Sequence, residues 1–192
     1  MDARYAVVTA VGEDRVGLVR DLSSAVERAG CNIEESRMAV LGGEFAVVML
    51  VSGPTESLER LTRDAPSLGS DIGLHVQTRL TRPPQRGGAG RPYILESVSL
   101  DAPGIVHAVT ELLRRHGVNI EDMDTETASA PWTGAPMFRM RAHVVIPAGV
   151  SLTELRHELR ALELERDLDI ALRPVVVPGS EPARHGEAGP GG

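Results

Sequence analysis

The sequence predicts an α+β protein made of two ferredoxin-like βαββαβ modules, each an antiparallel sheet with its helices on one face. Three observations support this fold class. The chain repeats itself at an offset of 87 residues, each repeat shows strand and helix patterns in the same order, and a Gly/Pro-rich segment separates the repeats. These observations predict a first module at 1–82, a linker at 83–90, a second module at 91–178 and a disordered tail at 179–192.

The repeat is strongest over 21 consecutive positions that begin at Asp14. Eight of these 21 residues are identical to the residues 87 positions later, and the matches include Gly17 and Asn32. Because composition alone does not produce such ordered matches, we infer a duplication. We expect Asp14 to superimpose on Asp101, and Asn32 on Asn119.

The elements of the first copy follow from periodicity and turn residues. Apolar and β-branched residues predict strands at 5–11, 33–41, 44–51 and 72–80. Apolar residues at helical spacing, ended by a glycine, predict the first helix: Val19, Leu22, Val26, Ala29 and Gly30. A second helix is predicted at 56–63, and Gly42-Gly43 predicts a tight hairpin between the middle strands.

The second copy has the same plan. Strands are predicted at 93–100, from Ile120 onward, at 137–146 and at 168–177. The first helix is predicted by another apolar set that ends at a glycine: Ile105, Val109, Leu112, Leu113 and Gly117. A capping-box pattern from Ser151 to Glu154 predicts a helix at 152–165. A loop at 129–136, with two prolines, replaces the tight hairpin.

Composition excludes several classes of function. The net charge is −7, the acidic excess is spread along the chain, and all 20 basic residues are arginine. This argues against a direct nucleic-acid surface, and a Schiff-base or phosphate-loop lysine is impossible. With Cys31 as its single cysteine the chain can form no internal disulfide, and we see no signal peptide or membrane span. We expect a cytoplasmic protein with no membrane partner.

A first candidate site is the Asp-x-x-Gly turn between the first strand and helix of each copy. A glycine at this turn lets a ligand approach the backbone, and the N–H groups at the helix start attract a carboxylate. The alternative is structural: the aspartates only cap their helices, and the glycines only permit close packing. The candidate residues are Asp14, Gly17 and Leu18, and in the second copy Asp101, Gly104 and Ile105.

A second candidate is the asparagine of the Gly-x-Asn-Ile segment that begins the second strand. The amide of Asn32 or Asn119 can donate to a carboxylate and accept from an ammonium group. The alternative is a turn residue with no ligand. We expect the Asp turn and the Asn to lie at the same end of the sheet, so that one small zwitterion contacts both.

The two segments together resemble the ACT domain, a regulatory module that binds amino acids at interfaces between paired copies. The resemblance covers residues 5–178 and is densest over 5–53. It implies ligand contacts from Asp14, Asn32 and the residues beside them, including Ile33, and from Asp101, Asn119 and Ile120 in the second copy. The chain departs from the family in having Asp where serine-binding members have Asn, and Val16 where Pro is common.

The resemblance also implies a function. We expect a non-enzymatic, amino-acid-sensing regulator whose ligand is a small amino acid such as glycine. Its protein partner would be a transcription regulator of glycine and one-carbon metabolism, of the LysR type, contacted without direct nucleic-acid binding. We expect the two modules to pair within the chain and the chain to form a homodimer. The alternative is a detached regulatory subunit of an amino-acid biosynthetic enzyme.

We assign no catalytic residue, metal or cofactor. Asp122, Asp124 and Glu126 alternate on one strand as metal ligands do, but a solvated strand face explains them better. The histidines show no close pairing of the zinc type. An RNA-binding domain with the same βαββαβ plan is set aside, because each third strand carries a single Phe and no base-stacking pattern.

Overall fold

The computed structural model describes residues 4–83, 90–130 and 133–175. The chain divides into two compact units, Met1–Gln85 and Arg86–Gly192, and each is described by itself.

The predicted linker and tail fall mostly where the structure gives no description. The tail at 179–192 lies wholly outside the described residues, as do positions 84–89 of the linker. Gly90, which we assigned to the linker, instead begins a strand of the second module.

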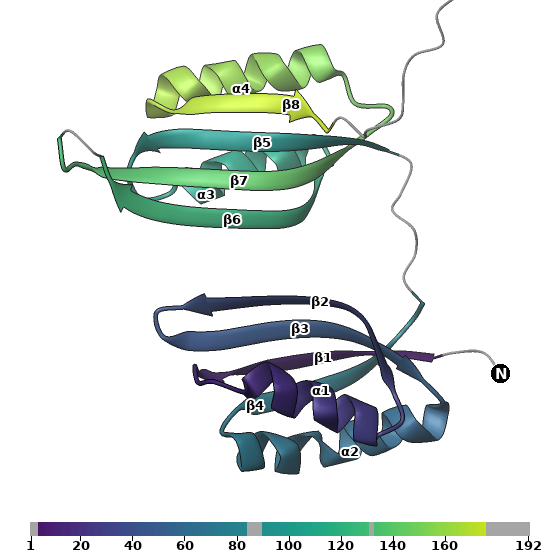
Figure 1. The fold of residues 1–192 in the computed structure, drawn as a ribbon. Coiled ribbons are helices and arrows are strands. Elements are labelled where there is room, and N and C mark those ends of the chain that lie inside the picture. The colour runs from purple at the N-terminus through teal and green to yellow at the C-terminus, as the bar shows by residue number, and fades with distance from the viewer. Residues whose placement is uncertain (1–3, 84–89, 131–132, 176–192) are drawn as a thin grey trace, which may run out of the picture. The chain divides into compact units, whose positions relative to one another are not determined.

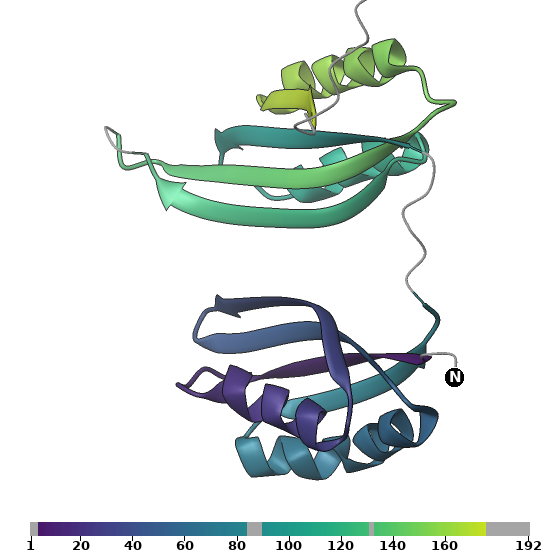
Figure 2. The same ribbon diagram turned by 45° about the vertical axis from the view of Figure 1, so that its right-hand side comes forward.

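The first module has the predicted order of elements, with four antiparallel strands in the spatial order β2-β3-β1-β4. Both helices cover one face of the sheet, as two views show (Figures 1 and 2). The bounds are β1 Arg4–Glu13, α1 Leu18–Arg28, β2 Asn32–Leu41, β3 Glu44–Gly53, α2 Thr55–Ile72 and β4 His75–Thr81.

The second module repeats this arrangement with strand order β6-β7-β5-β8. Its bounds are β5 Gly90–Leu100, α3 Ile105–Arg115, β6 Asn119–Ser129, β7 Pro136–Pro147, α4 Leu152–Arg166 and β8 Asp169–Pro174. The ladder of β2 shifts register after Ile33, and that of β6 shifts after Ile120. The same bulge at the same repeat position supports the duplication.

Each module has its own core between the helices and one face of the sheet. Leu22 of α1 and Leu58 of α2 pack with alternate residues of β1 and β3 such as Val8. An equivalent cluster forms under α3 and α4. The four predicted helix residues of α3 are all buried, but Val19 of α1 is 52% exposed. The apolar stripe of α1 runs through Leu18 instead, so the expectation for Val19 is wrong.

The second helix of the first module is longer than predicted. We expected it to end at Arg63, but α2 continues through Pro66 to Ile72. Pro66 removes one backbone donor, yet the helix persists because its buried face continues across the proline, with Leu61 and Ala65 before it and Gly69 after it. β4 consequently begins at 75 rather than 72.

Two local predictions from turn chemistry are confirmed. Gly42 and Gly43 both have positive φ, 62° and 88°, as a tight hairpin turn requires. The Ser151 hydroxyl accepts a hydrogen bond from the Glu154 N–H at 3.3 Å and caps α4. Among the described helices, none is long and apolar enough to cross a membrane.

Candidate functional site

The turn before α1 needs its glycine for backbone conformation. Gly17 has φ 97° and Gly104 has φ 90°. These values lie in the left-handed region, which is unfavourable for every residue that carries a Cβ. A Cβ on Gly17 would meet only the Arg15 side chain, at 3.8 Å, and a Cβ on Gly104 would meet nothing within 4 Å. The alternative that these glycines serve close packing is therefore wrong.

The aspartates at the turns do not cap their helices. Gly17 and Gly104 occupy the N-cap positions, and neither α1 nor α3 has a side-chain cap hydrogen bond. The first N–H groups of each helix therefore lack the partner that a Ser or Asp N-cap supplies. The capping alternative for Asp14 and Asp101 is excluded, and both helix starts can still accept an anionic group.

A cleft opens beside the first turn. It has a volume of about 650 Å³, and its lining includes Asp14, Gly17 and Leu18 on one side and Met38 and Val40 of β2 on the other. This volume lies within the range of about 300–1,000 Å³ that is usual for small-molecule sites. The structure thus brings together three of the predicted site residues of the first module.

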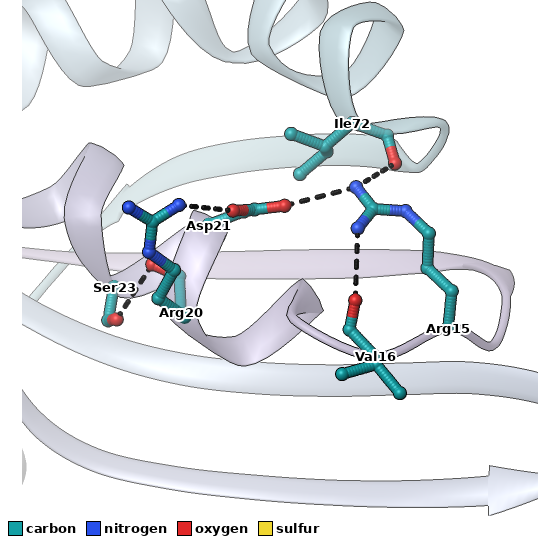
Figure 3. Close-up of polar contacts among 6 residues, drawn as sticks. All are labelled: Arg15, Val16, Arg20, Asp21, Ser23 and Ile72. Carbon is teal, nitrogen blue, oxygen red and sulfur yellow. Dashed lines mark hydrogen bonds and ion pairs between the residues drawn. The ribbon is translucent and has the colours of Figure 1, made fainter.

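Arg15 lines this cleft. Its side chain makes three hydrogen bonds (Figure 3). Its Nη2 donates to Asp21 Oδ2 at 3.0 Å and to the Ile72 carbonyl oxygen at 3.1 Å, and its Nη1 donates to the Val16 carbonyl oxygen at 3.3 Å. Arg20 also donates to Asp21, at 3.3 Å. The hydrogen bond from Arg15, followed by that from Arg20, lowers the pKa of Asp21 below its ordinary value.

The asparagine does not lie at this end of the sheet. Asn32 and Tyr5 both pair with Ser52, near the start of β1, whereas Asp14 follows the last residue of β1, Glu13. Eight residues of strand separate the two levels, which is roughly 26 Å at 3.3 Å per residue. The expectation that one module brings both groups to one small ligand is wrong, because β1 and β2 run parallel and α1 returns the chain to the starting edge.

The amide of Asn32 has a local partner. Its Nδ2 donates to Glu34 Oε1 at 3.1 Å, and the Ser52 hydroxyl donates to the same oxygen. These hydrogen bonds, that from Ser52 first, lower the pKa of Glu34. The cluster joins β2 to β3 at the bulge.

The second module separates its candidates in the same way. Asp101 follows the end of β5, and Asn119 begins β6. Because β5 and β6 run parallel, the two residues lie at opposite ends of the sheet. The apolar candidates are mainly structural. Leu18 and Ile105 are buried in the cores, and Ile33 and Ile120 pack partly buried against them. Only their backbone groups are candidates for ligand contact.

The sequence reading missed the second wall of the cleft. Met38 and Val40 lie on the helix-facing side of β2, since their pairing partners Val47 and Phe45 are core residues. They are nevertheless half exposed, because α1 does not cover that end of β2. The alternation of side chains along a strand could have predicted which face they lie on. No local pattern predicted that they would be exposed there.

The acidic residues that resemble metal ligands lie opposite a histidine and two arginines on the neighbouring strand. Asp122, Asp124 and Glu126 pair with His143, Arg141 and Arg139 on the same face of β6 and β7. Glu126 and Arg139 form an ion pair at 3.5 Å. This face is the one that the helices leave open.

Known proteins are similar to this chain in sequence and in fold. A family model described as ACT domain matches residues 4–79. The glycine cleavage system transcriptional repressor of Escherichia coli is 30% identical over 159 residues, which is 82% of this chain and 83% of the relative. A crystal structure of an unknown protein from Galdieria sulphuraria is 36% identical, covers 91% of this chain and all of that one, and superimposes with a TM-score of 0.79. Another, provisionally assigned as a glycine cleavage system transcriptional repressor, is 26% identical with a TM-score of 0.72 over 92% of this chain.

The duplicated sheet, the open helix starts and the cleft define a protein of two ACT domains in tandem, a regulatory class. Within that class, the chain belongs to the family of the glycine cleavage system transcriptional repressor.

Proposed function

We propose that this protein is a non-enzymatic regulator that senses an amino acid. The ligand binds at the turns before α1 and α3, and binding changes the affinity of the protein for a transcription regulator of glycine and one-carbon metabolism. The observation that carries the proposal is the pairing, in both modules, of an uncapped helix start with an aspartate three residues before the N-cap glycine.

The two groups at each turn suit the two charges of an amino acid. The carboxylate of Asp14 can accept hydrogen bonds from an ammonium group, and the N–H groups that open α1 can donate to a carboxylate. The Asp14 N–H itself donates to the Gly43 carbonyl oxygen at 2.9 Å, which holds the turn against the β2–β3 hairpin. A preorganised turn lowers the entropic cost of binding.

A second copy of the chain would add the asparagine to the site. Within the described residues, β2 is an edge strand with no neighbour on its outer side. Two β2 strands that pair antiparallel across a two-fold axis would place the Asn32 end of one against the Leu41 end of the other. Asn32 of the partner subunit would then approach the turn that carries Asp14. We therefore propose a homodimer in which each site is shared.

The downstream partner is proposed to be a protein. A net charge of −7 with no lysine does not favour a phosphate backbone, so an effect on transcription would act through protein–protein contact. We propose a LysR-type transcription regulator, on the strength of the relationship to the transcriptional repressor.

The test is a thermal-shift screen of the full chain against the common amino acids, followed by calorimetry. A ligand that binds only the native state raises the midpoint of unfolding. We expect at least one amino acid to bind, and Asn32→Ala with Asn119→Ala to weaken its binding by roughly tenfold to a hundredfold while the fold persists. Asn32→Asp controls for side-chain size, because it keeps the shape of asparagine but loses the amide donor to the ligand carboxylate. It should weaken binding as the alanine variant does.

Two results would contradict the proposal. If no amino acid shifts the midpoint at millimolar concentration, the protein is not an amino-acid sensor. If the double alanine variant binds as tightly as the wild type, the asparagines are only part of the β2 and β6 bulges. Light scattering of the wild type tests the homodimer independently.

A further inference from the structure

The cleft of the first module has an apolar wall that the fold leaves exposed. Val19 is 52% exposed, Met38 55% and Val40 48%, and all three line the cleft of about 650 Å³. They come from α1 and from the helix-facing side of β2. Exposed apolar side chains gathered around a concavity, next to a few polar groups, are typical of a site that a ligand fills.

The strand ladders identify the equivalents of this wall in the second module. Two cross-strand pairs of β2 and β3 correspond to two of β6 and β7: Val40–Phe45 to Thr127–Phe138, and Met38–Val47 to Thr125–Met140. The second module therefore presents two exposed threonines where the first presents Met38 and Val40.

Two further hydroxyls occur on β5, which lies on the other side of β7 from β6. Ser97 and Ser99 of β5 occupy the positions that Ala10 and Gly12 occupy in β1. Both serines are buried, and within the described residues their hydroxyl oxygens have no hydrogen-bond partner. A buried hydroxyl is costly without a partner, so these serines make this end of the second core more polar than the equivalent end of the first, where Ala10 and Gly12 carry no hydroxyl.

We infer that the two turn sites are specific for different ligands, and that the first site selects an amino acid with an aliphatic side chain, of the leucine, isoleucine, valine or methionine class. This inference rests on the proposed function and specifies the ligand of its first site. The ammonium group binds Asp14, the carboxylate binds the start of α1, and the side chain packs against Val19, Met38 and Val40.

Glycine fits this cleft poorly on physical grounds. It offers the same ammonium and carboxylate groups but has no side chain, so the apolar wall stays in contact with water. Each methylene that the cleft removes from water adds about fourfold to affinity, at roughly 0.8 kcal/mol per CH₂. A four-carbon side chain such as that of leucine therefore favours binding over glycine by more than about tenfold, even when it is only partly covered.

The test is calorimetry of the full chain with leucine, valine and methionine against glycine and serine. The decisive variant is Met38→Thr with Val40→Thr, which gives the first wall the residues of the second. The matched control is Val48→Thr, since Val48 is similarly exposed at 51% but lies on the open face of β3, outside the cleft. We expect the double variant to lose about tenfold in leucine affinity, and the control to bind as the wild type does.

The remaining outcomes separate the two proposals. If glycine binds at least as tightly as leucine, or the double variant binds leucine unchanged, the inference fails while the amino-acid sensor stands. If no amino acid binds, both fail. If the double variant changes only the mass measured by light scattering, the cleft is an interface between two copies of the chain, and the inference is overturned.

Discussion

Arg15 and Ile72 are 57 residues apart in the chain, yet the Arg15 Nη2 donates to the Ile72 carbonyl oxygen at 3.1 Å. The bond joins the turn before α1 to the last residue of α2 (Figure 3). Because carbonyl oxygens at a helix C-terminus carry partial negative charge, a guanidinium is a favourable partner. The same nitrogen also binds Asp21, so the first residues of α1 and the end of α2 are held by one side chain.

Removal of this side chain should be visible in the titration of Asp21. Arg15→Ala removes the hydrogen bond that most lowers the pKa of Asp21, so that pKa should rise toward the ordinary value of an aspartate. Arg20→Ala is the control and should give a smaller rise, because its hydrogen bond contributes less. NMR titration of the Asp21 carboxyl measures both, and equal rises would contradict the assignment.

The cluster of Asn32, Glu34 and Ser52 should make the β2–β3 junction sensitive to acid. The pKa of Glu34 is lower in the folded protein than its ordinary value of 4.5, so the carboxylate stabilises the folded state above that pH. This contribution should be lost as the pH falls below about 4.5 and through the folded pKa. Ser52→Ala should raise the Glu34 pKa more than Asn32→Ala does, as measured by NMR. The reverse order would show that Asn32 is the main partner.

The N-cap glycines should tolerate alanine poorly. Gly17→Ala and Gly104→Ala should each lower the free energy of unfolding by about 1–2 kcal/mol, because a Cβ is disfavoured at positive φ. Gly149→Ala is the matched control: a Cβ there meets nothing within 4 Å and its φ is not in the positive range. Urea denaturation of the three variants makes the comparison. A neutral Gly104→Ala would contradict the backbone argument, since no steric contact can compensate at that site.

The two cores should respond separately to truncation. Leu58 and Leu155 are both fully buried, one in each core. Leu58→Ala should destabilise the first module by about 2–5 kcal/mol, and Leu155→Ala should do the same to the second. Hydrogen exchange of the core amides resolves the modules. If Leu58→Ala speeds exchange equally in both, the modules unfold as one cooperative unit.

The sequence was sufficient for the fold because the repeat supplied each element twice. A weak pattern in one copy was supported by a clear one in the other, as with α1 and α3. The predictions from sequence were wrong where tertiary packing outweighs a local signal. The second helix was expected to end at Arg63, but α2 continues through Pro66 to Ile72, with Gly69 buried after the proline.

The candidate site was predicted only in part. The turn could be found because Gly17 and Gly104 have a local conformational reason to be glycine. The position of Asn32 depends on which strands run parallel, and the cleft depends on how far α1 covers β2. Neither property is encoded in a short motif.

The two modules differ in the connection between their middle strands, and this gives the chain a built-in optical label. Gly42-Gly43 closes the first hairpin, whereas the connection from β6 to β7 is longer and contains Trp132, the single tryptophan of the protein. Tryptophan emission therefore originates only within the second repeat. Changes in that emission report directly on the second repeat, and a tryptophan introduced at the first hairpin would supply a matching signal from the other half.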